Sequence, residues 1–396
     1  VRETKRVYGW PEDAEFLIPD GVPEHFAAGI GERGGRLRQE WEQLKVGYGR
    51  EYETLARGID QMQHRELPDG WDNDIPSFEP DPKGLATRKS SNQVLNAIAP
   101  QVPWLVSGSA DLTGSASSGL DFDGAGTFSP SDRSGRELHY GIREHESAAI
   151  SNGLSLCKLR PVWSTYLIFS DYARPSIRLS ALMELPVVHW FSHDSIGLGE
   201  DGPTHQPVEQ LASLRAMPGL NVIRPCDGNE VAEAWRVMMQ QRHQPSALVL
   251  TRQDVPTLDR ERYASAEGLR HGGYVLADCK GEPQVILIAT GSEVHIAVDA
   301  YEDLTAEGVR ARVVSLPSWY LFDNQSEEYR ESVLPQAVGA RVAVEQASTL
   351  GWDRYVGPEG KIVAMHTFGA SAPLAELQRK FGFTPEGVVE AARELL

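Results

Sequence analysis

Strands and helices alternate along the chain from Thr87 onward, and this alternation limits the possible folds more than any other feature. Short apolar runs such as WLVSGS, PVVHWFS and SALVL are each separated from the next by a stretch with helical periodicity. A helix that connects two strands of one sheet requires those strands to run parallel. The pattern therefore predicts an α/β fold with parallel or mostly parallel sheets flanked by helices, and with working loops at the carboxyl ends of the strands.

A second run of the same kind begins near Tyr274, with the strands QVILIATG, RARVVSLPS, ARVAVEQ and KIVAMHT. We therefore predict two consecutive α/β domains, residues 85–265 and 266–396. Residues 1–84 differ, because they hold a proline-bounded opening, a polar helical run from about His25 to Gln63, and a Pro/Asp-rich segment. This composition predicts a connecting arm. The helical run carries one apolar stripe that must lie on another surface, made by Phe26, Ile30, Leu37, Trp41, Leu44 and Tyr48.

Composition and charge exclude several classes of protein. A chain of 396 residues with 41% hydrophobic and 24% charged residues is an ordinary folded protein with more than one core. Its net charge of −18, without a basic patch, argues against binding to nucleic acid or to an anionic membrane surface. No apolar run is long enough to span a membrane. The three cysteines lie far apart and without CxxC spacing, so we expect reduced thiols, no zinc site, and a cytoplasmic location.

The stretch from His193 to Gln206, HDSIGLGEDGPTHQ, directly follows a predicted buried strand. It combines two histidines, three acidic residues and several glycines within fourteen positions. No helix or strand needs that density of titratable and conformationally permissive residues for its own stability. The stretch therefore predicts a loop built for chemistry.

Five other polar or aromatic motifs are weak when taken singly. Glu144 in GIREHE is explained equally well as a carboxylate at a helix start paired with Arg143. In STYLIFSDYARP, Tyr166, Phe169 and Tyr172 recur every three residues, a spacing that more often reflects packing in a core than a platform for stacking a ligand. The turn ATGSEV could present amides to an anion, but it lacks the GxGxxG pattern, so a plain strand-to-helix turn is favoured. GSADLTGS has the composition of a turn, and Arg252 in TRQD could be an exposed charge.

Together, the order and wording of these motifs resemble transketolase. The segments that carry the resemblance are TRKSSN, GSADLTGS, HYGIREH, FSDYARPSIRLSALM, HDSIGLGEDGPTHQPVEQLASLRAMPG, ALVLTRQ, ILIATGSEV and MHTFGASAP. The resemblance implies a thiamine-diphosphate enzyme that transfers two-carbon ketol units between sugar phosphates in the pentose phosphate pathway. It covers the whole chain but only the last part of a transketolase, since the GDG motif of the amino-terminal domain is absent. The chain is expected to hold the pyrimidine-binding and carboxyl-terminal domains.

The resemblance also assigns the cofactor residues. Glu144 matches the glutamate that activates the cofactor by sharing a proton with the pyrimidine N1′ atom. Phe169 matches the aromatic residue that stacks on the pyrimidine ring, with Tyr166 and Tyr172 beside it. The family more often has Phe at the position of Tyr166. Asp111 matches a residue near the cofactor at the subunit boundary.

The substrate residues follow in the same way. Asp201 matches the residue that accepts a hydrogen bond from a sugar hydroxyl, and His205 the catalytic histidine near the reacting carbon. No residue of this chain is expected to bind a metal, because Mg²⁺ or Ca²⁺ and the diphosphate belong to the absent amino-terminal domain. The group that matches the sugar-phosphate ligands consists of Arg88, Ser115, His193 and Arg252.

In the family, the active site is shared between two chains, so we expect a homodimer or a partner chain carrying the diphosphate-binding domain, and no activity from this chain alone. Three possibilities stay open: part of a longer transketolase, the pyrimidine-binding subunit of a split transketolase, or a non-catalytic transketolase-like binding module. The intact set of matched residues argues against the third. A related thiamine enzyme similar to dihydroxyacetone synthase is the alternative activity.

Overall fold

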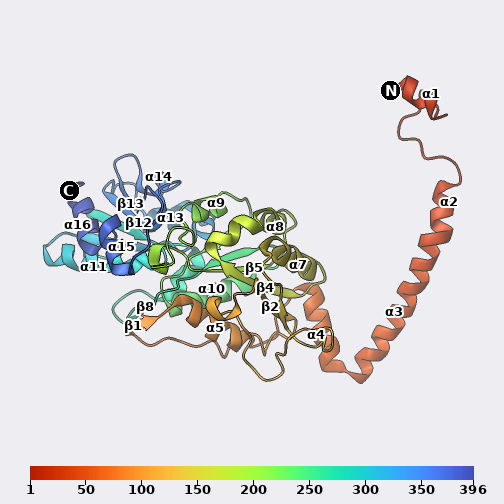
Figure 1. Cartoon of the computed structure of the whole chain (residues 1–396), viewed down its shortest axis with the longest axis horizontal. Helices are drawn as coiled ribbons and strands as arrows, with labels where there is room; N and C mark the ends of the chain where they lie inside the picture. The colour runs from red at the N-terminus through yellow and green to blue at the C-terminus, as the bar shows by residue number, and fades with distance from the viewer. The chain divides into compact units, whose positions relative to one another are not determined.

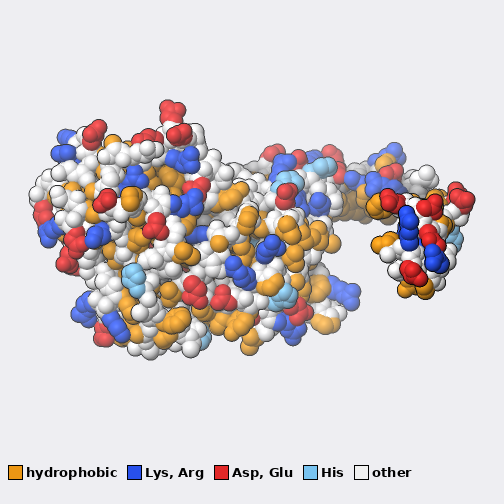
Figure 2. All heavy atoms as spheres, turned by 90° about the horizontal axis from the view of Figure 1, so that it is seen from above, with side chains coloured by type: hydrophobic (Ala, Val, Ile, Leu, Met, Phe, Trp, Pro, Cys, Tyr) orange, Lys and Arg blue, Asp and Glu red, His pale blue; other side chains and the backbone are white.

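The computed structural model describes residues 1–396, which form two compact units, Val1–Gln61 and Met62–Leu396. None of the helices combines the length and the apolar character needed to cross a membrane. On the face drawn in Figure 2, Lys and Arg side chains are interspersed with Asp and Glu and do not form a continuous basic patch.

The first unit is helical. Its elements are α1 (Arg2–Val7), α2 (Val22–Phe26), the π-helical turn η1 (Ala27–Gly31), α3 (Glu32–Glu51) and α4 (Glu53–His64), the last of which runs on past the unit's end. The single helix predicted from about His25 to Gln63 is therefore interrupted, because Tyr52 leaves the helical conformation with φ −129° and ψ 60°. The predicted apolar stripe remains exposed except at the half-buried Tyr48, with Leu44 at 71%.

Six parallel strands form the first sheet of the second unit, in the order β3-β2-β4-β5-β7-β6. Its strands β2, β4 and β5 are labelled in Figure 1. They are β2 (Leu105–Ser109), β3 (Glu137–His139), β4 (Arg160–Tyr166), β5 (Val188–Ser192), β6 (Asn221–Ile223) and β7 (Ser246–Val249). The helices of this part are α5 (Thr87–Ile98), α6 (Thr113–Ala116), α7 (Glu144–Leu156), α8 (Ser170–Leu182), α9 (Gln210–Arg215) and α10 (Gly228–Gln240).

Helices cover both faces of this first sheet. Alternate residues of each strand enter opposite cores, as the twofold period of a strand requires. On β5, Trp190 packs with α5 and α10, whereas Phe191 packs with α7 and α8. The predicted α/β architecture with a parallel sheet is confirmed for this part of the chain.

The second sheet has five strands in the order β13-β12-β10-β11-β9. They are β9 (Tyr274–Ala277), β10 (Val285–Ala289), β11 (Ala311–Ser315), β12 (Arg341–Ser348) and β13 (Lys361–Met365). All pairings are parallel except that of β9 with β11. The surrounding helices are α11 (Glu293–Ala306), α12 (Trp319–Asp323), α13 (Glu327–Val333), α14 (Asp353–Val356), α15 (Leu374–Phe381) and α16 (Pro385–Arg393).

The alternation along the sequence does not reveal two antiparallel pairings. One is β9, at the edge of the second sheet. The other joins β1 (Asp81–Leu85) to β8 (Val255–Thr257), so the Pro/Asp-rich segment predicted as a linker ends in a strand. This pairing requires Gly84, because a Cβ atom there would lie 1.6 Å from the carbonyl oxygen of Val255. The domain boundaries after residues 84 and 265 stay predictions.

Candidate functional site

The predicted site residues, apart from Arg88 in α5, follow the carboxyl ends of five neighbouring strands. Tyr166 ends β4, His193 follows β5, and Arg252 lies three residues after β7. Asp111 and Ser115 follow β2, and Glu144 opens the helix after β3. Because these strands are parallel, their ends meet at one edge of the sheet, which is where ligands bind in open α/β sheets.

Three aromatic rings lie in a row at the end of β4. The rings of Tyr166 and Phe169 are stacked with centroids 5.8 Å apart, and those of Phe169 and Tyr172 with centroids 6.0 Å apart. Both predicted histidines contact this row: His193 stacks on Tyr166 at 3.6 Å, and His205 meets Phe169 edge to face at 5.6 Å. The structure thus brings five of the predicted residues together, with Phe169 half-buried and Tyr172 exposed at the outer end.

Glu144 is the first residue of α7, and its side chain is buried, with 7% of its surface exposed. The hydroxyl of Thr165, next to Tyr166, donates a long hydrogen bond of 3.5 Å to the carboxylate. The alternative partner, Arg143, instead pairs with Glu146 at 3.5 Å, and Glu144 forms no salt bridge. The helix N-terminus favours a carboxylate there. The fold therefore holds a buried carboxyl group with acceptor capacity to spare.

Two guanidinium groups and a histidine form a cationic corner. The guanidinium of Arg88 donates to the backbone carbonyl of Arg252, its buried Nε has no partner, and neither arginine forms a salt bridge. Burial and the charge of Arg252 lower the pKa of Arg88. Burial, with Arg88 and Arg252 adding to it, lowers the pKa of His193 to about 3. A bound anion would relieve this concentration of uncompensated positive charge.

The backbone of His193 has φ 60°, which is uncommon for a residue other than glycine and marks a sharp change of direction after β5. Further along the same loop, Asp201 is exposed and has no side-chain partner in the chain. The hydroxyl of Thr204 lies 3.0 Å from Nδ1 of the half-buried His205. These two side chains remain available to a ligand at the edge of the sheet.

Asp111 and Ser115 share the edge but do not join the cluster. Both are exposed, and the hydroxyl of Ser115 donates to the carbonyl of Leu112 at 3.3 Å. Asp111 has φ 64°, a left-handed conformation that Asp tolerates better than most residues. No hydrogen bond, ion pair or ring contact links either residue to the aromatic row or the cationic corner.

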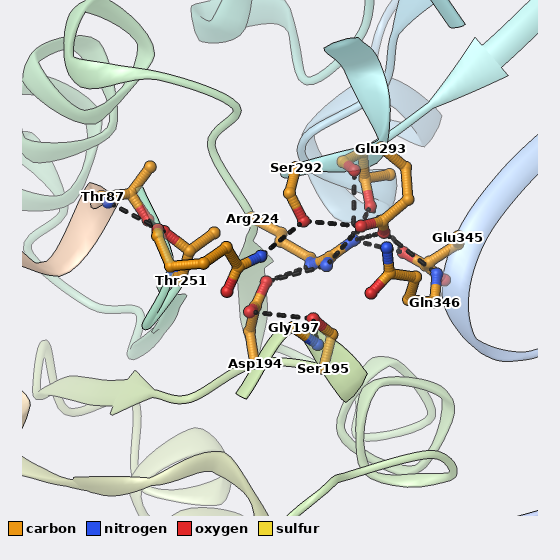
Figure 3. A network of polar contacts seen from close by, with 12 residues as sticks. Thr87, Asp194, Ser195, Gly197, Arg224, Thr251, Ser292, Glu293, Glu345 and Gln346 are labelled. Atoms are coloured by element: carbon orange, nitrogen blue, oxygen red, sulfur yellow. Dashed lines mark hydrogen bonds and ion pairs between the residues drawn. The ribbon is translucent and has the colours of Figure 1, made fainter. Parts of the chain in front are cut away.

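Sequence reasoning missed a buried ionic network beside this site, drawn in Figure 3. Arg224, after β6, binds Asp194 of the site loop and Glu293 of the ATGSEV turn. In that turn Glu293 accepts hydrogen bonds from the amide of Gln346 and the hydroxyl of Ser292. The protein's own carboxylate thus occupies the start of α11, so the structure agrees with a plain turn. The only signal in the sequence was that a charged residue follows each of three strands: Asp194 after β5, Arg224 after β6 and Glu293 after β10.

Two family models match the chain. The model described as "Transketolase, pyrimidine binding domain" matches residues 83–257, and the model described as "Transketolase-like TK C-terminal domain" matches residues 272–384. The first match contains every predicted site residue, and the second contains the five-stranded sheet.

Curated relatives match over the whole chain. The transketolase of Halalkalibacterium halodurans is 48% identical over 397 residues, which is 100% of this chain and 59% of the relative. A chloroplastic transketolase of Craterostigma plantagineum is 45% identical and is covered over 76% of its length. The chain spans about three fifths of the length of most of the curated relatives it matches.

Solved structures agree with these matches. A transketolase from Pichia stipitis in complex with sedoheptulose 7-phosphate superposes with a TM-score of 0.92 at 40% identity, covering 100% of this chain and 58% of that one. A split-gene transketolase, described as an inactive β4 tetramer, matches 79% of this chain and 99% of its own, with 28% identity and a TM-score of 0.64. Sequence, fold and the geometry of the strand-end site agree, and the chain belongs to the transketolase family.

Proposed function

We propose that this chain supplies the pyrimidine-binding half of a transketolase active site, which transfers a two-carbon ketol unit between sugar phosphates in the pentose phosphate pathway. One observation carries the proposal: a buried carboxyl group without an ionic partner, Glu144, accepts a hydrogen bond from Thr165, the neighbour in sequence of Tyr166 in a row of stacked aromatic rings that contacts two histidines. An aminopyrimidine ring needs that combination of a proton-sharing acid and an aromatic wall.

The residues present fit the pyrimidine part of thiamine diphosphate. When bound, this cofactor supplies the carbon that accepts the two-carbon unit. Glu144 would hold a proton at a ring nitrogen, because its only side-chain partner is the weakly placed Thr165 hydroxyl. Phe169 would stack on the ring and exclude water, with Tyr166 and Tyr172 extending the wall. Asp111 lies at the same edge and would approach the cofactor at a subunit boundary.

The substrate would lie across the cationic corner and the site loop. Arg88, Arg252 and His193 would bind the phosphate, helped by Ser115, since both guanidinium groups lack carboxylate partners within the chain. Asp201 would accept a hydrogen bond from a sugar hydroxyl. His205, which meets Phe169 edge to face, would lie near the reacting carbon and hold or move a proton there.

The diphosphate and its Mg²⁺ or Ca²⁺ are assigned to residues outside this chain. No group of three or more His, Cys, Asp or Glu side chains here could hold a metal ion. A second subunit is supported by an apolar surface beside the site, on and next to α7 and α8, formed by Ile150, Leu156, Tyr172, Leu179, Leu182 and Met183. We therefore propose a homodimer of the whole protein, in the cytoplasm, whose sites are completed across the subunit boundary.

A second candidate is the pyrimidine-binding subunit of a split transketolase. The split-gene protein favours it, because this chain matches 99% of that subunit, and its β4 tetramer is described as inactive. Under either candidate, this chain alone is expected to be inactive.

The test is ketol transfer from a ketose phosphate to an aldose phosphate, measured with thiamine diphosphate and Mg²⁺. The chain is assayed alone and as part of an assembly with a transketolase diphosphate-binding domain. We expect turnover only in the assembly and only with the cofactor. Absence of thiamine-dependent transfer from a correctly assembled complex that binds the cofactor would overturn the proposal and leave a binding module.

A further inference from the structure

The site loop, residues 193–206, has little internal structure of its own. Its backbone hydrogen bonds close only a few turns. For example, the amide of Gly202 donates to the carbonyl of Gly199, and the amide of His205 donates to the carbonyl of Gly202. It has no strand, and its only helix is the 3₁₀ turn η3 (Ile196–Leu198). A loop of this kind needs external contacts to hold Asp201 and His205 in one place.

The second sheet provides the first of these contacts, next to His193. Asp194 lies 2.8 Å from Arg224, which also donates to Glu293 at 3.2 Å and to the hydroxyl of Thr290 at 3.1 Å (Figure 3). Asp194, Arg224 and Glu293 are almost completely inaccessible to solvent. A buried charge is stable only while its partners are in place. The start of the loop is therefore fixed to the turn between β10 and α11.

The far end of the loop is fixed to the segment that follows β13. The buried side-chain amide of Gln206 donates from Nε2 to the carbonyl of Gly199 at 2.8 Å and to that of Ala370 at 2.9 Å. The hydroxyl of Ser371 donates to the carbonyl of Glu200. Between the two ends, Ile196 packs into the core of the second sheet. The loop thus rests on the second sheet while its other side presents His193, Asp201 and His205.

We infer that the five-stranded sheet acts in catalysis as a clamp on the site loop, with Gln206, the backbone carbonyl of Ala370 and the hydroxyl of Ser371 as positioning groups for Asp201 and His205. This inference rests on the proposed function for its kinetic part. It gives the carboxyl-terminal domain a role that needs no ligand of its own.

Gly369→Ala tests the clamp. A Cβ atom at Gly369 would lie 1.8 Å from Oε1 of Gln206, so the amide must move away from Ala370. Gly339→Ala is the matched control, because its Cβ would meet nothing within 4 Å and it precedes a strand of the same sheet. Ser371→Ala is a milder second variant that removes only the bond to Glu200.

The first measurement is hydrogen exchange in the full chain, which requires no activity. In Gly369→Ala we expect amides of residues 196–206 to exchange about five- to tenfold faster, the factor that corresponds to losing about one hydrogen bond. Strands β10 to β13 should keep their protection. Unchanged exchange in the loop of both Gly369→Ala and Ser371→Ala, or equal acceleration throughout the second sheet, would overturn the clamp.

The second measurement is kinetic and uses the assembled enzyme. We expect KM for the ketose phosphate to rise about five- to tenfold in Gly369→Ala. The affinity for inorganic phosphate should stay unchanged, because Arg88 and Arg252 lie outside the loop and His193 lies at its start, which the Asp194–Arg224 pair holds in place. Gly339→Ala should behave as wild type. If wild type itself transfers no ketol unit, the proposed function fails, whereas the exchange data still decide whether the clamp exists. Unchanged KM together with faster loop exchange would remove its catalytic part.

Discussion

Both sheets of the second unit are flanked by helices, yet the charged side chains beside the two sheets differ in whether the chain gives them an ionic partner. At the first sheet, Glu144, Arg88 and Arg252 have no ionic partner in the chain. At the second, Glu293 and Glu345 are paired with Arg224 and Arg215 in a network closed to solvent. The same architecture therefore supports a site open to a ligand at one sheet. At the other it supports a buried network of ion pairs closed to solvent, here called the sealed joint.

This difference teaches how to recognise a site in an α/β protein. Charged residues at strand ends occur in both sheets, so their position alone does not identify a function. A buried or half-buried charge costs free energy unless something compensates it. Where the chain supplies the compensating charge, the group is structural; where it does not, the fold leaves that role to a ligand. Four experiments can break or sharpen this distinction.

The largest effect is expected for Glu144→Gln in the assembled enzyme. Glutamine fills the same space but cannot share a proton in the same way, so kcat should fall about 10²- to 10⁴-fold. Glu146→Gln is the matched control, since Glu146 lies on the same helix, is exposed and pairs only with Arg143. The measurement is thiamine-dependent turnover together with circular dichroism. Unchanged turnover would show that Glu144 is as structural as Glu293.

Next comes Arg224→Met, which leaves Asp194 and Glu293 buried without their cation. We expect the free energy of unfolding to fall by about 3–5 kcal/mol, measured by denaturant titration. Arg354→Met, which breaks an exposed pair with Asp323, should change it by less than about 1 kcal/mol. A small effect of Arg224→Met would mean that the second sheet's network is not the sealed joint described above.

A smaller effect is expected for Arg252→Ala, which removes one of the two unpaired guanidinium groups. Because a charge-assisted hydrogen bond is lost, KM for a ketose phosphate should rise about 10- to 100-fold. The control is the substrate: the same ketose without its phosphate should not distinguish the variant from wild type. An equal loss with both substrates would contradict the assignment of this corner to phosphate.

The smallest effect concerns pH. The pKa of His193 is about 3 in the fold and about 6.5 when unfolded, so its contribution is present above pH 6.5 and lost as the pH falls toward 3. We therefore expect the free energy of unfolding to fall by about 2 kcal/mol, through His193 alone, as the pH is lowered from 7 to 5. Inorganic phosphate, bound beside Arg88 and Arg252, should raise the pKa of His193 and reduce this loss.

The second sheet provides the contrast to that pH effect. Despite burial, Arg215 holds the pKa of Glu345 near 2, so its contribution is lost only as the pH falls from about 4.5 toward 2, and phosphate should not alter it. Unfolding titrations at matched ionic strength, with and without phosphate, make the measurement. If the dependence of the unfolding free energy on pH between 7 and 5 is the same with and without phosphate, the result would argue against an anion site at His193.

Much of the fold follows from local pattern. The sequence pattern predicts helices over residues 144–156, 228–240 and 374–381, and α7, α10 and α15 have those bounds in the structure. At α10 the reason is visible, because Asp227 caps the helix by accepting from the amide of Glu230. By contrast, β1 and β9 were not predicted, because their antiparallel partners are set by tertiary contacts. For β1, the paired residues lie 170 or more positions away along the chain.

The site was predictable only in part, and for a similar reason. Motif wording identified the residues, but no pattern in the sequence tells that the ring of His193 lies 3.6 Å from that of Tyr166. The network around Arg224 was missed because its partners lie far apart in the sequence: Asp194 follows β5, Glu293 begins α11, and Glu345 lies within β12. Burial distinguishes such a joint from exposed charges, and burial is a property of the packed structure.

The short antiparallel pair β1 and β8 has a genetic consequence. Asp81 pairs with Thr257 and Leu85 with Val255, so the chain enters and leaves the first sheet at the same point. A break in the gene inside this pair separates strands that must pair, whereas a break outside it leaves all six parallel strands on one piece. Such a piece would still lack Glu293 and Glu345, the carboxylates beside the buried Arg224.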